Sequence, residues 1–141
     1  MQLTEQQQEN LANLIDGLVS NKYQQTRFTL RDDNGYCVGG VMCDISERGT
    51  WRLKSPMGHR YFEYNMAGSN LPTDADLFIS LVPAVVALDF GLTRGAVEIL
   101  SAANDAGADF LELANALDRY AHDDGQGTKW SQALRMDIGD L

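Results

Sequence analysis

The first twenty residues carry a helical pattern of apolar and polar positions. Thr4 precedes the acidic start Glu5, as an N-cap residue precedes the first turn of a helix. The apolar residues then recur at intervals of three and four: Leu11, Leu14, Ile15 and Leu18. Such positions share one face of a helix, so the pattern predicts an amphipathic helix over residues 5–20.

The following segment alternates instead. Phe28 and Leu30 fall on one side of residues 25–31, and the positions between them are polar or basic. An Asp-Asp-Asn-Gly sequence at 32–35 comes next, and these residue types are typical of turns. The alternation predicts one short strand that ends at this turn.

Residues 36–45 fit two structures. Their apolar positions have helical spacing, but the pair Gly39 and Gly40 lies among them, and each glycine costs about 1 kcal/mol inside a helix. We favour the helix, because Cys37, Gly40 and Val41 would form a strip of small residues against which another helix packs closely. A strand with a glycine bulge is the alternative.

A hairpin is predicted in the middle of the chain. Two aromatic-rich runs, at residues 51–53 and 60–64, flank a Pro-Met-Gly sequence at 56–58. Aromatic residues favour strands, and proline with glycine favours a turn between them.

The pattern after residue 71 is helical. An apolar helical segment is predicted at 78–81. Pro83 is placed to begin a helix over 85–90, and Gly91 is placed to end it.

Two further helices are predicted beyond Gly91. The first is capped by Thr93 and continues to Ala103, and residues 104–108 then form a tight turn with Gly107 in a left-handed conformation. The second begins at about Asp109. Its apolar residues have clean helical spacing: Phe110, Leu113, Ala114, Leu117 and Ala121.

Length and composition fit one globular domain over residues 1–141. With 44% hydrophobic residues, a chain of this size buries roughly two-thirds of its unfolded surface. We predict an α+β fold: a mostly helical single domain with a small antiparallel sheet or hairpin in the middle third. A flexible link at about 122–128 leads to a C-terminal segment, 129–141, in which Trp130 and Leu134 predict a short docking helix.

Targeting and cysteine patterns point to the cytoplasm. The Gln-rich N-terminus lacks the basic and apolar regions of a signal peptide, and Pro83 and Asp89 interrupt the most apolar stretch, residues 77–92. No membrane association is therefore expected. Cys37 and Cys43 have no zinc-site spacing, so we interpret them as reduced, structural thiols.

Charge is distributed unevenly along the chain. The formal net charge is -9 in total: -3 over residues 1–21, +3 over 22–60 and -9 over 61–141. An acidic protein of this kind is a poor general binder of phosphate backbones. An acidic part and a basic part would instead steer a partner, or allow copies to stack head to tail as a homo-oligomer.

The acidic helices are the first candidate site. Residues 93–120 have the length of a DNA-binding helix-turn-helix, but acidic residues on the second helix would be repelled by phosphates, so no direct DNA binding is expected. The same acids would imitate phosphates on a basic protein surface. The candidate partner-binding residues are Asp109, Glu112, Asp118, Asp123 and Asp124.

The basic middle third is the second candidate. Cations lie among aromatic residues there, as in sites that bind nucleotides or other anions, although cross-strand packing also explains the aromatic residues. The candidate residues are Arg52, Lys54, Arg60 and Tyr61. With His59 and His122 as the two histidines and no catalytic or phosphate-loop motif, we expect no enzymatic activity, no cofactor and no metal.

Short sequence pieces resemble a group of small proteins found mostly in tailed bacteriophages. The pieces are Tyr23-Gln24, Phe28–Arg31, Gly35–Asp44, Trp51, Val82-Pro83, Leu88, Gly91-Leu92, Asn104–Gly107 and Phe110–Ala114. The chain has Val38-Gly39 where that group usually has Cys-Leu, so one of a pair of cysteines is absent. This departure argues against a metal or redox role for the pair.

The resemblance implies a phage accessory protein without an assigned catalytic activity. With the charge pattern, it leads us to expect an inhibitor of a bacterial host or anti-phage defence protein, acting by protein–protein binding in the cytoplasm of the infected cell. An oligomer that sequesters a nucleotide signal and a component of the virion or of DNA packaging are the alternatives.

Overall fold

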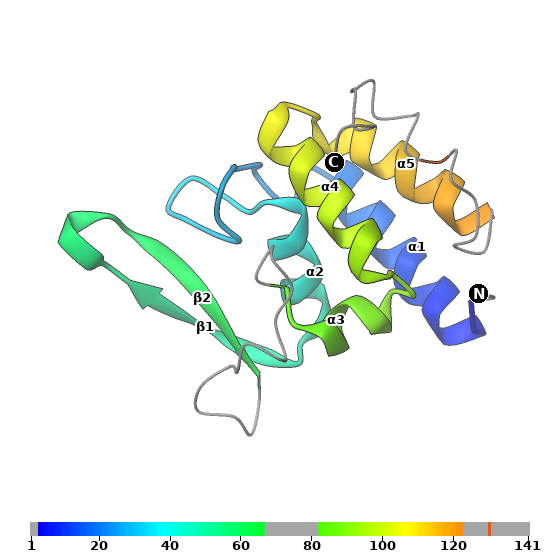
Figure 1. Cartoon of the computed structure of the whole chain (residues 1–141), viewed down its shortest axis with the longest axis horizontal. Helices are drawn as coiled ribbons and strands as arrows, with labels where there is room; N and C mark the ends of the chain where they lie inside the picture. Colours follow the sequence, from blue (N-terminus) through cyan, green and yellow to red (C-terminus); the bar gives the residue numbers. More distant parts are fainter. Residues whose placement is uncertain (1–2, 67–81, 123–129, 131–141) are drawn as a thin grey trace.

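The computed structural model describes residues 3–66, 82–122 and 130, and shows the expected α+β fold. The helices are α1 (Glu5–Val19), α2 (Val38–Ser46), α3 (Ala84–Asp89), α4 (Arg94–Ala106) and α5 (Phe110–His122). Strands β1 (Gly49–Lys54) and β2 (Tyr61–Met66) form an antiparallel pair, joined by a 3-10 turn, η1 (Pro56–Gly58). The hairpin projects from a body of helices (Figure 1). The predicted fold class is confirmed.

Helix α1 has the predicted start and the predicted buried face. The Thr4 hydroxyl accepts a hydrogen bond from the Gln7 backbone N–H at 3.1 Å, and the Thr4 N–H donates to the Gln7 side chain at 3.0 Å. This reciprocal pair satisfies two backbone donors at the start of the helix. Leu11, Leu14 and Leu18 are buried.

Helix α2 lies at the centre of the core. Its first six residues, 38–43, are all buried, as in a helix that is enclosed on every side. The helical interpretation of residues 36–45 is therefore confirmed, and the bulged-strand alternative is wrong.

Close packing explains the two glycines of α2, but the neighbour differs from the one predicted. A side chain at Gly40 would overlap the backbone carbonyl of Leu30, and one at Gly39 would lie 2.6 Å from Val82 Cγ2. These contacts belong to the connecting segments before α2 and before α3, not to another helix face.

The strand predicted over residues 25–31 is not formed. Phe28 has φ of +70°, which interrupts the extended backbone, and the segment makes only isolated bridges from Gln25 and Arg31 to neighbouring residues. The turn at 32–35 is present, because Asp32 Oδ1 accepts from the N–H groups of Asn34 and Gly35 at 2.8 and 3.0 Å. Residues 20–37 are thus a loop, which we call the α1–α2 loop.

Side chains of α4 hold this loop. The fully buried Asn104 donates from Nδ2 to the Thr26 carbonyl at 2.9 Å, and its Oδ1 accepts from Gln25 Nε2 at 2.9 Å and from the Val38 N–H at 3.1 Å. Asp105 Oδ1 accepts from the Phe28 N–H at 2.8 Å. The tight turn predicted at 104–108 is wrong, because these two residues belong to α4.

The ends of the three C-terminal helices follow the predicted signals. Pro83 precedes α3, Gly91 follows it with φ of +70°, and Thr93 caps α4 through the Ala96 N–H at 3.1 Å. Gly107 ends α4 with φ of +120°, the left-handed conformation expected of it. Helix α5 is amphipathic, and it buries Phe110, Leu113, Ala114, Ala116, Leu117 and Tyr120.

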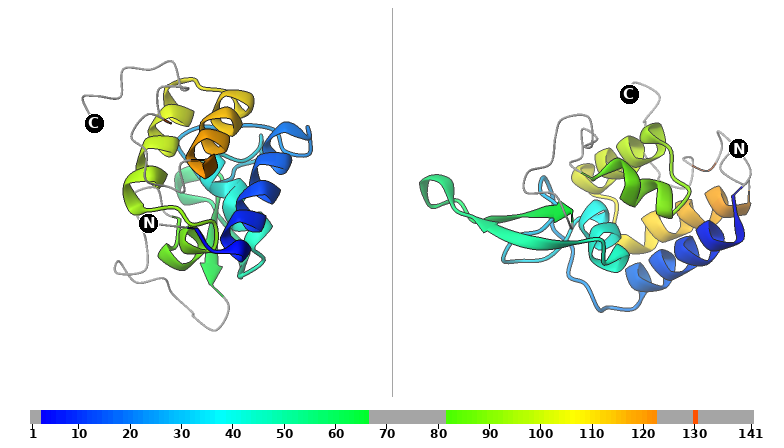
Figure 2. Two further views of the ribbon diagram at one scale, coloured as in Figure 1. Left: turned by 90° about the vertical axis from the view of Figure 1, so that its right-hand side faces the viewer. Right: turned by 90° about the horizontal axis from the view of Figure 1, so that it is seen from below.

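Helices α1 and α5 lie side by side and antiparallel (Figures 1 and 2). The Tyr120 hydroxyl donates to the Gly91 carbonyl at 2.8 Å, and the buried Trp130 packs edge-on against the Tyr120 ring at 5.3 Å. The helix predicted at 78–81, the link over 123–128, Leu134, Asp123 and Asp124 lie outside the described residues. None of the helices in residues 3–66 and 82–122 has the length and apolarity that a bilayer crossing requires.

Candidate interaction surfaces

The charge pattern of the sequence becomes a separation in space. The α1–α2 loop and the hairpin, residues 22–37 and 49–66, carry six basic and three acidic side chains, a net charge of +3. The described helical body, residues 3–21, 38–48 and 82–122, carries eleven acidic and three basic side chains, a net charge of -8. The hairpin extends away from the body (Figure 2), so its share of the positive charge, +2, lies apart from most of the acidic helical surface, whereas the α1–α2 loop lies against α4.

Helix α5 brings together part of the predicted acidic site. Asp109 is exposed, but its Oδ1 accepts from the Glu112 N–H at 2.8 Å and so caps the helix. Glu112 is half-buried, and the exposed Asp118 lies 3.8 Å from His122 Nδ1. Arg119 is exposed on the same helix, so α5 alone is only weakly acidic.

Helix α1 carries a stronger acidic stripe, which the sequence analysis missed. Glu5, Glu9 and Asp16 are exposed and are separated by four and seven residues. At 100° per residue these intervals keep the three carboxylates on one face, over about 16 Å of helix axis. The helix has no basic residue. The sequence contained this signal, because the spacing of the three acids places them on one face of the predicted helix. Counting charges by segment of chain did not reveal it.

The basic candidates fall into two groups. Arg52, Lys54 and Tyr61 share one face of the hairpin, because Arg52 pairs with Glu63 and Lys54 pairs with Tyr61 across the strands. The Glu63 carboxylate lies among them, 3.8 Å from Lys54 Nζ. Arg60 turns towards the α1–α2 loop, where its Nε lies 2.7 Å from Asp33 Oδ2. The structure does not bring the four residues into one site.

Arg60 and Tyr61 line a hollow with the α1–α2 loop. Its volume is about 430 Å³, within the range of small-ligand and side-chain pockets. The loop contributes Arg27 and Phe28, and the hairpin contributes His59. The Phe28 ring is 81% exposed, and Met57 at the hairpin tip is fully exposed. Sequence alternation had placed Phe28 with Leu30 on one side of a strand, whereas here Leu30 is buried and Phe28 is exposed.

Most of the aromatic residues near the basic candidates are used in packing. The rings of Tyr23, Tyr36, Trp51 and Tyr64 contact one another edge-on in succession, at centroid distances of 5.0, 5.9 and 5.0 Å. The Arg31 guanidinium lies over three rings, 4.4 Å from Phe62, 5.0 Å from Tyr36 and 5.4 Å from Trp51. Asp44 accepts from the Tyr23 hydroxyl at 2.7 Å and from Trp51 Nε1 at 3.2 Å.

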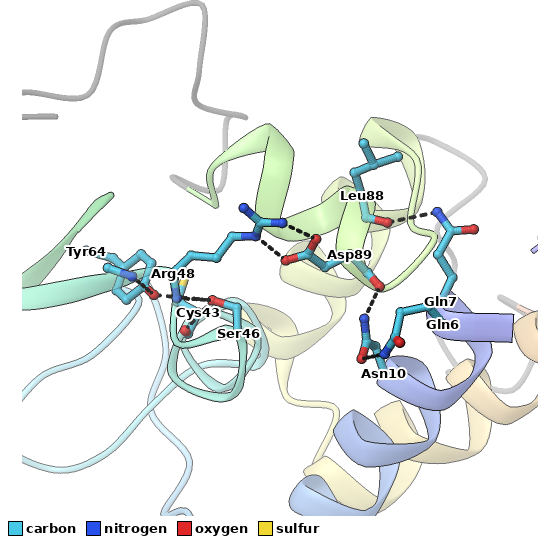
Figure 3. A network of polar contacts seen from close by, with 10 residues as sticks. Gln6, Gln7, Asn10, Cys43, Ser46, Arg48, Tyr64, Leu88 and Asp89 are labelled. Atoms are coloured by element: carbon cyan, nitrogen blue, oxygen red, sulfur yellow. Dashed lines mark hydrogen bonds and ion pairs between the residues drawn. The ribbon is translucent and has the colours of Figure 1, made fainter. Parts of the chain in front are cut away.

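A polar network fixes the base of the hairpin to the body (Figure 3). Arg48 forms a bidentate ion pair with Asp89, with Nη2 at 2.9 Å from Oδ1. The carbonyls of Leu88 and Asp89, at the end of α3, accept from the side chains of Gln7 and Asn10 of α1 at 2.9 and 2.8 Å. Planar bidentate pairs fix geometry as well as charge, so the pair ties the residue just before β1 to the end of α3.

A family comparison covers most of this structure. Residues 7–121 match the family described as a domain of unknown function, DUF8296. The chain belongs to DUF8296. No curated protein and no solved structure showed a significant match to it.

Both charged ends lie largely within the DUF8296 region. The match extends from the first turns of α1 to the last turn of α5, and it includes the loop and the hairpin. Of the acidic stripe of α1, Glu5 lies outside the match and Glu9 and Asp16 lie inside it.

The two cysteines of this DUF8296 chain are free and buried. Burial raises the pKa of Cys37 to about 11 and also raises that of Cys43. A thiol that holds its proton is a poor nucleophile and a poor metal ligand, which agrees with a structural role. Within the part of the chain that the structure describes, no three Cys, His, Asp or Glu side chains gather as metal ligands would.

Proposed function

We propose that this protein is a non-enzymatic bacteriophage accessory protein that binds a bacterial protein through the acidic face of α1 and α5. Its partner would be a host or anti-phage defence protein with a basic surface, such as one that handles nucleic acid, in the cytoplasm of the infected cell. The sequence resemblance to phage proteins supports the biological setting. The concentration of negative charge on the helical body supports the choice of α1 and α5 as the binding surface.

The observation that best supports this surface is the acidic stripe of α1, a helix without a basic residue. The stripe consists of Glu5, Glu9 and Asp16. Asp118 of the antiparallel neighbour α5 adds a further exposed carboxylate. A surface of one sign accelerates the encounter with a basic partner by about tenfold or more at low salt, and the effect weakens as ions screen it. Such a surface is suited to occupying a site that otherwise receives phosphates.

The geometry supports a nucleotide-sequestering function less well. Arg60 is paired with Asp33 and lies apart from Arg52 and Lys54, and Glu63 lies among the latter two. A bound phosphate would meet these carboxylates as well as the cations. Protein binding is therefore the function that we propose.

Affinity capture from a bacterial lysate, followed by a binding titration with the captured protein, tests the proposal. The variant Glu5→Gln, Glu9→Gln, Asp16→Asn and Asp118→Asn removes four charges without shortening a side chain. Asp109 stays unchanged because it caps α5. We expect the variant to bind at least about tenfold more weakly than the wild type, with a flatter dependence on salt.

The matched control changes exposed, uncharged residues of the same helix, Gln8→Ala and Asn13→Ala. This control should bind like the wild type. Equal binding of the wild type and the four-charge variant at every salt concentration would contradict the proposal.

A further inference from the structure

The two edges of the hairpin differ in what lies against them. On the outer side of β2, the Phe62 N–H donates to the Arg31 carbonyl at 2.8 Å, so the α1–α2 loop occupies this edge. Strand β1 forms the opposite edge, on the side of the hairpin away from the loop (Figure 1). The outer edge of a sheet carries backbone groups that can pair with another strand. The edge of β1 is therefore the place where a further strand can be added.

The pairing of the two strands shows which backbone groups of β1 point outward. Opposite residues of an antiparallel pair alternate between those that exchange hydrogen bonds and those whose groups point away from each other. Because the Phe62 N–H points away from β1, its partner Leu53 points away from β2, and so does Trp51 two residues earlier. Among residues 3–66 and 82–122, no backbone group meets the N–H or C=O of these two residues. Both N–H groups and both carbonyls are thus available at the edge.

The side chains of β1 favour a partner with acidic and apolar residues. The hairpin, residues 49–66, carries three basic and one acidic side chain, a net charge of +2. Arg52 and Lys54 share one face of it. Arg52 takes part in no ion pair within the part of the chain that the structure describes, and the pair of Lys54 with Glu63, at 3.8 Å, is exposed and contributes little. Leu53 lies on the other face and is 42% exposed.

Strand geometry turns these positions into a sequence pattern. Residues directly opposite each other on neighbouring strands share a face of the sheet. A strand added to β1 would therefore place acidic residues beside Arg52 and Lys54, and apolar residues beside Leu53. The segment that fits is extended, and acidic and apolar residues alternate along it.

A second copy of this chain fits the edge of β1 poorly. If two β1 strands paired antiparallel through all their outward groups, Trp51 of each copy would lie opposite Leu53 of the other, and Arg52 would lie opposite Arg52. Like charges at directly opposite positions destabilise a sheet. Charged residues on edge strands are one means by which proteins prevent such pairing. The cations of β1 thus disfavour its own edge and favour an acidic segment.

We propose that the outer edge of β1 binds an extended acidic segment of a partner protein as a third strand. Trp51 and Leu53 exchange backbone hydrogen bonds with the segment, and Arg52 and Lys54 pair with its carboxylates. In strand addition of this kind, the main chain supplies affinity and the side chains supply specificity. A third strand also extends a two-stranded hairpin, which is marginally stable by itself. The contact involves neither α1 nor α5, so it is separate from the proposed function.

A synthetic, fluorescently labelled peptide of alternating glutamate and valine tests the proposal with the full-length chain. Fluorescence anisotropy should give a Kd below about 1 mM in about 0.05 M salt, and binding at least about tenfold weaker in about 0.5 M salt. The control peptide has the same composition, but its glutamates and valines form two separate blocks. It should bind at least about tenfold more weakly, because its acids do not share one face of a strand. Absence of binding by the alternating peptide, or equal binding of the two peptides, would overturn the proposal.

The variant Leu53→Pro tests the backbone contact. Proline has no N–H, and the N–H that it removes here points outward and takes no part in the β1–β2 ladder, so the hairpin should still form. Leu53→Ala is the matched control, because it shortens the same side chain and keeps the N–H. We expect Leu53→Pro to bind the alternating peptide at least about tenfold more weakly than Leu53→Ala does. Equal binding by the two variants would contradict strand addition.

Hydrogen exchange of the wild-type protein gives a readout that needs no substitution. The amides of Trp51 and Leu53 point outward in the free protein, so they should exchange at least about tenfold more slowly when the alternating peptide is bound. The amide of Arg52, which faces β2, should change less. Peptide binding that leaves the Trp51 and Leu53 amides unprotected would place the peptide elsewhere on the molecule and would refute the assignment to this edge.

Discussion

Replacing Asn104 by alanine tests whether the α1–α2 loop is held by α4. Asn104 is completely buried, and its amide joins three parts of the chain: Thr26 and Gln25 of the loop, Val38 at the start of α2, and α4 itself. Alanine fits the helix but makes none of these hydrogen bonds. The substitution therefore removes the hydrogen bonds of the Asn104 amide and leaves the backbone of α4 unchanged.

The magnitude follows from the groups that lose their partners. The Val38 N–H and the Thr26 carbonyl would each become unsatisfied, at about 1–3 kcal/mol apiece. Gln25 keeps a partner, because its Nε2 also donates to the Ala108 carbonyl at 2.8 Å. Alanine recovers roughly 0.7 kcal/mol through its better helix propensity. The expected loss in the free energy of unfolding is about 1–5 kcal/mol.

Urea unfolding followed by circular dichroism measures this loss. The midpoint should fall while the slope of the transition stays constant, and Tm should fall by about 3–18 °C for a domain of this size. Asn115→Ala is the matched control, since Asn115 is exposed on α5, and it should change stability by less than about 0.7 kcal/mol. An Asn104→Ala protein as stable as this control would refute the role given to the amide.

Two further predictions concern α2 and its cap. Gly40→Ala should lower stability by about 2 kcal/mol or more, because the added methyl group overlaps the Leu30 carbonyl. Gly95→Ala, at the exposed second position of α4, meets no neighbouring atom and should not lower stability. Equal urea midpoints for the two variants would contradict the packing of α2. Burial raises the pKa of Cys37 to about 11 from an ordinary 9.0, so the folded thiol holds a proton that the unfolded thiol releases. Wild-type stability should therefore fall more between pH 9 and about 11 than that of Cys37→Ala, as measured by urea midpoints, and parallel pH profiles would contradict the assignment.

Local signals were sufficient for most helices and for the hairpin. The cap at Thr4, the spacing of Leu11, Leu14 and Leu18, and the left-handed glycine at 107 depend on interactions within one or two turns, and the structure contains each of them. Helix α2 was also predictable, because its apolar spacing outweighs two glycines that the packing requires. These are cases in which local preference and tertiary packing agree.

The α1–α2 loop could not be predicted because its conformation is determined 77 and 78 residues away. Asp105 fixes Phe28, and Asn104 fixes Thr26. The sequence around these two residues, Asn-Asp-Ala-Gly, has the composition of a turn, so it was interpreted as one. The same side chains that favour turns by bonding to a nearby backbone here bond to a distant backbone. Alternation in residues 25–31 carried no information about a positive φ at Phe28.

The candidate surfaces were partly accessible from sequence. Strand alternation places Arg52 and Lys54 on one face, and the pairing of Lys54 with Tyr61 then places Arg60 off it, so the four candidates were separable once the hairpin register was known. The acidic stripe of α1 was equally accessible from helical spacing. The position of Asp118 beside α1 was not, because it depends on α1 and α5 lying antiparallel, which no local pattern specifies.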